Sequence, residues 1–499
     1  MCPFPYNQTQ QPLTMRYEGP QGDSDMAIIR SGPLTWSQMW WVSGQPESGV
    51  SSHEDNLQMA IPAGRVSLEA ARAAVADVVR HHENLRSRLD RSGGGNPLQI
   101  VDAADDARLS DVIEVVPAAA SAEALQNAMR INFRVHEQWP IKVLVLADAG
   151  TASALLLVMD HWAVDAWSIA LLRRDLSAAL AARAGGSPWS PSGPIEQPVD
   201  VAEWEASESG GGIQLDGALR FWGDQLELMR RELNGFRSPL ASPGPAGAAP
   251  VFGSCQLASR RILRSAETVA SRLNVPVAAV FLAAYAAAIC AAEQAPAAGV
   301  FVLSANRLSG RARRSVRNAV LQAPVVLLAD DRAGFEENVA SAARQQVRSY
   351  RFANADPVAT EKMWIDVMGD LWRSGVASAQ FNYLSHDTLG PFIGEPVKVR
   401  AAGQPEPAAD ETVQFGEPRM QGPVYMLKVH QLSERVVMTL CWREDTGWGR
   451  VAESMLRYIE DLVCQGPDGA VFGRPQAIAG AGPVEPRTTS SGSNSSSSG

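Results

Sequence analysis

The chain of 499 residues contains little cysteine, and the positions of the cysteines exclude two common kinds of stabilised domain. The five cysteines are odd in number, widely spaced and never arranged as C-x-x-C; they are Cys2, Cys255, Cys290, Cys441 and Cys464. This pattern supports neither a zinc site nor a disulfide framework, so we predict no bound metal. It is typical of a protein that stays in the reducing cytoplasm.

The sequence also lacks an excess of positive charge, an evident leader and a convincing membrane span. Lys and Arg total 44 against 54 Asp and Glu, and the resulting net charge of -10 argues against nucleic acid as the main partner. The first ten residues have no basic start followed by an apolar core, so we expect no signal peptide. Residues 275–292 are uncharged but mostly alanine, which favours a buried core helix over a membrane span.

Length and composition predict a globular protein of two or three domains, since 45% of the residues are hydrophobic. Stretches rich in Gly, Pro and Ser mark the expected boundaries. We predict a flexible arm at 1–25, a first α/β lobe at 26–184, a crossing linker at 185–198, a second lobe at 199–479 and a disordered tail at 480–499.

One stretch, residues 153–184, combines a buried strand, a polar loop and an amphipathic helix. The apolar run 154–159 reads as a strand, and a helical period with Leu172 and Leu176 on its buried side ends before Gly185. That period places Arg173, Arg174 and Asp175 on the polar side of the helix. Between strand and helix lie polar residues that must be paired or functional, because an unpaired buried charge is costly; these are Asp160, His161, Asp165 and Ser168.

The spacing D-H-x-x-x-D-x-x-S in this loop resembles the HHxxxDG signature of the condensation-domain and chloramphenicol-acetyltransferase superfamily. His161 stands at the second histidine and Asp165 at the aspartate, whereas Asp160 replaces the first histidine and Ala166 replaces the glycine. Asp160, Asp165 and Ser168 also resemble the DxxxxDxxS signature of heterocyclization domains, which lack the motif histidine.

Further stretches resemble other motifs of this family in the family's order, between residues 34 and 462. Residues 34–41 resemble the L-S-x-A-Q-x-x-L-W pattern with Gln38 at the glutamine, and 82–89 resemble RHExLRTRF. The strand at 299–304 is followed by Asn306-Arg307, as the corresponding strand is in condensation domains, and 381–384 resemble their F-N-Y-L strand.

The resemblance implies two chloramphenicol acetyltransferase-like lobes, each a mixed β-sheet with helices, in a V-shaped pseudodimer with a central tunnel. It also implies acyl transfer in natural-product biosynthesis. The donor would be a thioester on the phosphopantetheine arm of an acyl or peptidyl carrier protein acting in trans, or coenzyme A, and the acceptor a small amine or alcohol. The resemblance implies no tightly bound cofactor, and the absence of a G-x-S-x-G elbow argues against an acyl-enzyme.

By the same resemblance, His161 is the catalytic base or orienting group, and Asp165 pairs with Arg307 as structural support. Asp160 is expected to hydrogen-bond the loop or His161, with Ser168 as a further support. The candidates for lining the tunnel are Trp162, Trp167, Gln38 and Asn382, with packing in the core as the alternative for the two tryptophans. A basic cluster is either an ordinary solvated loop or a docking surface for acidic carriers or phosphate; it consists of Arg311, Arg313, Arg314 and Arg317.

Two other interpretations remain open at this point. The departures at Asp160 and Ala166 also fit a degenerate scaffold that recruits another biosynthetic enzyme. The motif also allows a coenzyme A-dependent acyltransferase or a heterocyclization variant.

Overall fold

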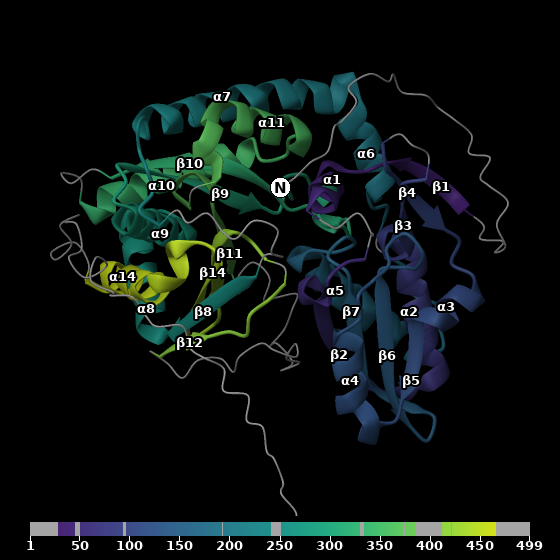
Figure 1. Ribbon diagram of the computed structural model, residues 1–499. Coiled ribbons are helices and arrows are strands. Elements are labelled where there is room, and N and C mark those ends of the chain that lie inside the picture. The colour runs from purple at the N-terminus through teal and green to yellow at the C-terminus, as the bar shows by residue number, and fades with distance from the viewer. Residues whose placement is uncertain are drawn as a thin grey trace, which may run out of the picture.

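The computed structural model describes residues 28–44, 50–92, 96–191, 193–240, 251–329, 334–373, 375–385, 412–420 and 422–465. The arm predicted at 1–25 and the tail predicted at 480–499 lie outside these residues. The described chain forms two α/β lobes side by side, each with its own sheet and hydrophobic core (Figure 1). The expected two-lobed fold class is confirmed.

The N-terminal lobe is built on a four-stranded sheet of order β2-β7-β6-β5 and a smaller sheet of order β1-β4-β3. Its helices and strands are β1 (Ile28–Pro33), α1 (Trp36–Ser43), β2 (Leu57–Ser67), α2 (Leu68–His81), β3 (Ser87–Asp90), β4 (Leu98–Asp102), α3 (Asp106–Val112), β5 (Ile113–Val116), α4 (Ser121–Met129), β6 (Ile141–Asp148), β7 (Thr151–Met159) and α5 (Ala166–Ala184). The antiparallel hairpin β6–β7 forms the middle of the larger sheet, as its two apolar runs predict.

The C-terminal lobe is built on a seven-stranded mixed sheet of order β10-β9-β11-β13-β14-β8-β12, in which β11 runs parallel to both of its neighbours. The elements that follow α5 are α6 (Pro198–Ala206), α7 (Ile213–Glu232), β8 (Phe252–Ser259), α8 (Arg260–Leu273), α9 (Val277–Glu293), β9 (Ala297–Ser304), β10 (Leu321–Leu328), α10 (Phe335–Arg351), α11 (Pro357–Met368), α12 (Gly375–Ser378), β11 (Ala379–Ser385), β12 (Val413–Phe415), β13 (Tyr425–Gln431), β14 (Val436–Arg443) and α14 (Ala452–Gln465). Short 3-10 and π turns join them, among them η1 (His53–Asp55), η2 (Glu83–Arg86), η4 (Glu208–Gly212) and η5 (Ala312–Arg314).

Helix α9 is the alanine-rich helix expected in the core, and nearly every one of its side chains is buried. Its small residues let α10 and α14 pack closely on it. Within the described ranges, no single helix has the length and apolarity to cross a membrane; only α8 and α9 together, bent by 109° at their junction, meet that criterion by length and composition.

Two sequence predictions about local structure are wrong. The sequence of residues 252–263 predicts one strand, but the strand ends at Ser259, whose hydroxyl accepts a hydrogen bond from the Ile262 amide and begins α8. Asp175 lies on the buried side of α5 rather than the polar side, because its carboxylate pairs with His82 Nε2 at 2.9 Å. A buried partner therefore overrides the helical period at this position.

Candidate active site

The loop between β7 and α5, residues 160–165, is called the motif loop below, and its start is a tight, buried turn. The Asp160 amide donates to Pro140 O at 3.0 Å, and Asp160 Oδ1 accepts from the Trp162 amide at 2.6 Å. Burial raises the pKa of Asp160 to about 6, although hydrogen bonds from Ser51 and the Trp162 amide oppose this rise. Asp160 thus bonds the loop, one of its two predicted contacts.

His161 follows at the junction of the lobes and is half-buried. Its ring Nδ1 is buried and has no hydrogen-bond partner among the described residues. Its backbone carbonyl accepts from Asn318 Nδ2 at 2.9 Å, and Asn318 belongs to the other half of the chain. The peptide that follows the His161 Cα is therefore held by the C-terminal lobe, while the buried ring Nδ1 makes no hydrogen bond to the described residues.

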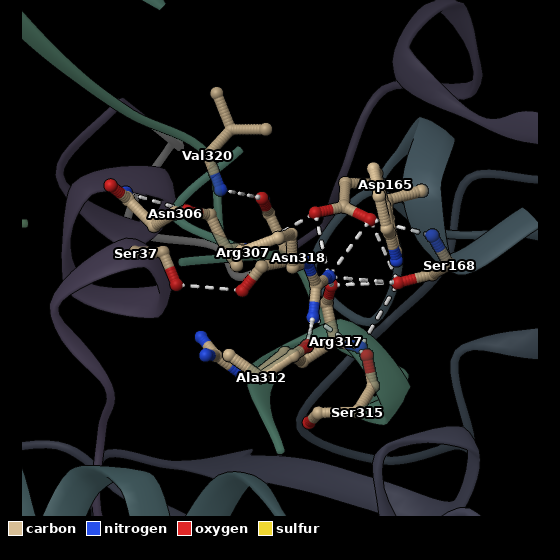
Figure 2. Close-up of polar contacts among 12 residues, drawn as sticks. Ser37, Asp165, Ser168, Asn306, Arg307, Ala312, Ser315, Arg317, Asn318 and Val320 are labelled. Carbon is tan, nitrogen blue, oxygen red and sulfur yellow. Dashed lines mark hydrogen bonds and ion pairs between the residues drawn. The ribbon is translucent and has the colours of Figure 1, made fainter. Parts of the chain in front are cut away.

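Asp165 caps α5 and forms the expected ion pair with Arg307 (Figure 2). Its carboxylate accepts from the amide and hydroxyl of Ser168, both at 2.8 Å, and from Arg307 Nη2 at 2.9 Å. The side chains of Asp165 and Arg307 are 1% and 3% exposed. Burial opposes ionisation of Asp165, but the Arg307 charge and the Ser168 hydrogen bonds outweigh it and lower its pKa.

The segment between β9 and β10, residues 305–320, carries the C-terminal lobe's contacts to the motif loop and is called the clamp segment below. Arg307 Nη1 donates to the carbonyls of Ala312 and Ser315, which folds the segment around the guanidinium. The segment also reaches into the first lobe, since Val316 packs in that lobe's hydrophobic core. The site is thus made jointly by two parts of the chain far apart in sequence.

Backbone groups of the clamp segment bond directly to polar side chains of the first lobe. The single hydrogen of the Ser168 hydroxyl is shared between Asp165 Oδ1 and Arg317 O, which lie 2.8 and 2.7 Å from Oγ, and Oγ also accepts from the Arg317 amide at 3.0 Å. The Ala319 amide donates to Asp165 Oδ2 at 3.1 Å. Sequence reasoning missed these contacts and Asn318, because backbone donors and neutral amides carry no signal in a motif.

Comparison with known proteins fits this geometry. The family model described as "Condensation domain" matches residues 30–355. The chain belongs to the condensation domain family. Solved condensation domains share the two-lobed arrangement described above.

This condensation domain is similar to parts of much larger proteins. It is 32% identical over 222 residues to a Salinispora arenicola protein described as a "Probable non-canonical nonribosomal peptide synthetase", and the alignment covers 43% of this chain and 3% of that protein. It is 35% identical over 191 residues to the isonitrile lipopeptide synthase of Mycobacterium tuberculosis, and this alignment covers 36% of this chain and 7% of the synthase. The chain thus spans a small fraction of these curated relatives.

Solved structures show the same fold at low sequence identity. The condensation domain that mediates chain release from the enacyloxin polyketide synthase aligns with a TM-score of 0.63 and 18% identity, covering 89% of this chain and 85% of that one. The X-domain in its complex with OxyB from teicoplanin biosynthesis aligns with a TM-score of 0.57 and 17% identity, covering 90% of this chain and 99% of that one.

Two of the residues predicted to line a tunnel are packed inside the N-terminal lobe of this condensation domain. Trp162 is 0% exposed and packs edge-on against Trp41, with the ring centroids 5.7 Å apart. Gln38 is buried and forms a capping box with Thr35 at the start of α1. Neither fits the predicted lining role, because large aromatics and amides in these motifs serve packing and capping here.

The other two lining candidates are partly exposed. Trp167 is half-buried, and its indole donates to Arg313 O in the clamp segment at 3.0 Å. Asn382 is half-buried on β11, next to the fully buried Phe381. Their partial exposure is compatible with lining a tunnel, and this role stays a prediction.

The basic cluster of the condensation domain divides into exposed and buried arginines. Arg311 and Arg313 are exposed, and Arg314 is half-buried. Arg317 does not fit the predicted docking role, because its side chain is 6% exposed and lies near Arg307. Burial, together with the Arg307 charge, lowers the pKa of Arg317 to about 10. In the described part of the chain, no group of three or more His, Cys, Asp or Glu could hold a metal ion.

Glu205 on α6 is a buried carboxyl group that sequence reasoning missed. It accepts from the Trp36 amide at 2.7 Å, which ties α6 to the start of α1. Burial raises its pKa to about 7, and the nearby Arg317 charge only partly opposes this rise. The folded protein therefore keeps a proton on Glu205 in a pH range where the unfolded chain has released it.

Replacing Glu205 with glutamine is expected to stabilise the protein at high pH. Between the unfolded pKa of 4.5 and the folded pKa of about 7, the folded state binds more protons, so stability falls as pH rises through this window. Above pH 7, ionisation of the buried Glu205 lowers the free energy of unfolding by at most about 3 kcal/mol. Urea unfolding at pH 5 and pH 8 measures it, and Glu205→Gln should gain clearly more stability at pH 8.

The exposed Glu203 on the same helix supplies the matched control, Glu203→Gln. An equal gain at both pH values for Glu205→Gln, or the same pH dependence in Glu203→Gln, would contradict a raised pKa at Glu205.

Proposed function

We propose that this condensation domain transfers an acyl group from a carrier-protein thioester to a small amine or alcohol, with His161 as base or orienting group. The observation that carries the proposal is the state of the three polar groups around the motif loop. Asp160 and Asp165 are buried and engaged in structural hydrogen bonds, whereas His161 is half-buried with an unpartnered ring Nδ1. Of these groups, the imidazole is the one left for proton transfer.

The proposed reaction needs little beyond two oriented reactants and one proton carrier. The acceptor nitrogen or oxygen attacks the thioester carbonyl, and its proton passes to the imidazole of His161. Collapse of the tetrahedral intermediate breaks the carbon–sulfur bond, and the departing thiolate takes up that proton. Because a thioester is already activated, orientation and proton handling account for the catalysis, and no acyl-enzyme is needed.

The donor in this proposal arrives on the phosphopantetheine arm of a carrier protein acting in trans. Arg311 and Arg313 are exposed on the clamp segment, which contacts the motif loop, and they suit an acidic carrier surface or a phosphate. Trp167 and Asn382, both half-buried, are the residues that we propose for the passage to His161.

Intact-protein mass spectrometry of the donor tests the proposal. The wild-type protein is mixed with an acyl carrier protein loaded as a thioester and with a panel of amines and alcohols. Loss of the acyl mass from the carrier, with an amide or ester product, is expected. Comparable efficiency with free acyl-coenzyme A would favour a coenzyme A-dependent acyltransferase instead. A product lighter by one water, from a Cys, Ser or Thr acceptor, would favour heterocyclization.

A non-catalytic recruitment scaffold is the second candidate, and one observation favours it. Asp160 stands where the family has its first histidine, and it is buried with its oxygen bonded to the loop. An X-domain of the same fold has been solved in complex with OxyB. Absence of transfer by the wild type with every carrier-bound and coenzyme A donor, in a folded protein, would support this second function.

A further inference from the structure

Asn318 is a buried amide of the clamp segment, 3% exposed, and its polar groups bond in three directions. Its side-chain Nδ2 donates to His161 O at 2.9 Å, and its Oδ1 accepts from the Val320 amide at 3.1 Å. Its backbone carbonyl accepts from Ser37 Oγ on α1 at 2.7 Å (Figure 2). Asn318 therefore connects three separate parts of the chain at one point.

We propose that Asn318 is a positioning residue for His161. The peptide just before the His161 Cα is held within the first lobe, because its carbonyl, Asp160 O, accepts from the Ala163 amide at 3.0 Å. The peptide just after the His161 Cα is held by the second lobe, through Asn318. The side chain projects from the Cα between these two anchors, so its direction depends on both. The kinetic part of this inference rests on the proposed function, and the placement of the ring does not.

Magnitudes separate this role from ordinary structural support. A neutral hydrogen bond is worth only about 1 kcal/mol of net stability. A displacement of a reacting group by about 1 Å, in contrast, can cost about 100-fold in rate. Loss of the Asn318 contact should therefore be visible at His161 while the overall fold changes little.

The substitution Asn318→Asp removes the amide donor but adds a buried carboxyl group, so the neutral Asn318→Ser is measured beside it. Asn318→Asp keeps the shape of the side chain and the oxygen that accepts from Val320, but it replaces the amide donor that faces His161 O with a second oxygen. With histidine carrying 13C at Cε1, the His161 ring signal, assigned by its loss in His161→Gln, is expected to shift or broaden. In the transfer assay, kcat is expected to fall about 10- to 100-fold with KM within about twofold.

Asn306 supplies a matched control in the same clamp segment. Its Nδ2 also donates to a backbone carbonyl, Ala319 O at 2.9 Å, and its backbone φ of 48° is one that Asp tolerates. Asn306→Asp should leave the His161 signal and kcat unchanged at a similar loss of thermal stability. Equal effects of the two substitutions on the His161 signal and on kcat would reduce Asn318 to structural support.

An unchanged His161 signal in folded Asn318→Asp would overturn the proposal, whatever the kinetics show. Because the signal needs no substrate, it decides the placement even if the wild type transfers no acyl group, so failure of the proposed function remains distinguishable. If Asn318→Asp does not fold, the neutral Asn318→Ser gives the same comparison, since its side chain is one bond shorter and its hydroxyl falls short of His161 O.

Discussion

Replacing His161 with alanine is expected to lower the rate of acyl transfer by about 10²- to 10⁴-fold without lowering the unfolding midpoint. The rate loss follows from removal of the proposed proton carrier. The stability should hold because the ring is half-buried, with its Nδ1 unpaired, and the structural contact of His161 runs through its backbone carbonyl. Alanine keeps that carbonyl and therefore keeps the bond to Asn318.

Two further variants make this result specific. His161→Gln retains a hydrogen-bond donor without a base, so a rate closer to the wild type would assign His161 an orienting role rather than proton transfer. His136→Ala removes another half-buried histidine of the same lobe, one that pairs with the exposed Glu137, and should leave the rate unchanged. Transfer by His161→Ala at the wild-type rate would remove the catalytic role of His161.

Breaking the buried pair of Asp165 and Arg307 is expected to cost about 3–5 kcal/mol of unfolding free energy. Arg307→Met would leave the Asp165 carboxylate buried, still accepting from Ser168 and the Ala319 amide but without its counter-charge. It would also leave the carbonyls of Ala312 and Ser315 without the Nη1 donor that folds the clamp segment. Loss of activity on Asp165→Ala would therefore not by itself show a catalytic role.

Urea unfolding of the single variants and of Asp165→Asn/Arg307→Met measures this coupling. The double variant should lose less than the sum of the two singles, because neither partner is then left as a lone buried charge. The pair of Lys362 and Asp366 on the exposed side of α11 is the control, and Lys362→Met should cost less than about 1 kcal/mol. A loss below about 1 kcal/mol in Arg307→Met would show that this pair does not hold the lobes together.

Much of the fold could be predicted because its elements have strong local signals. The apolar run before Asp160 became β7, and α5 ends at Ala184 just before Gly185, as its period and its glycine stop indicate. The family resemblance supplied a long-range feature that local pattern lacks, the pairing of Asp165 with Arg307, 142 positions apart.

The rest of the site could not be predicted, for physical reasons that differ between residues. Asn318 acts through a neutral amide and a backbone carbonyl, which leave no charge or spacing pattern to find. Trp162 and Gln38 occur in motifs near the site, but sequence proximity does not give exposure, and both side chains turned inward. The pKa of Glu205 depends on how completely α6 covers the carboxyl group, which is a property of tertiary packing alone.

The clamp segment lies in the second half of the chain, and this position has a consequence for folding during synthesis. As the nascent chain leaves the ribosome, the motif loop emerges well before the segment that will contact it, and its contacts join residues separated by 142 to 157 positions. Contacts between residues so far apart in sequence form late in folding, because the conformational entropy of the intervening chain must be lost first. Until residue 307 has been synthesised, Asp165 in the first half therefore lacks its guanidinium partner, and a translation arrest in that interval would release an intermediate in which the contacts between the motif loop and the clamp segment have never formed.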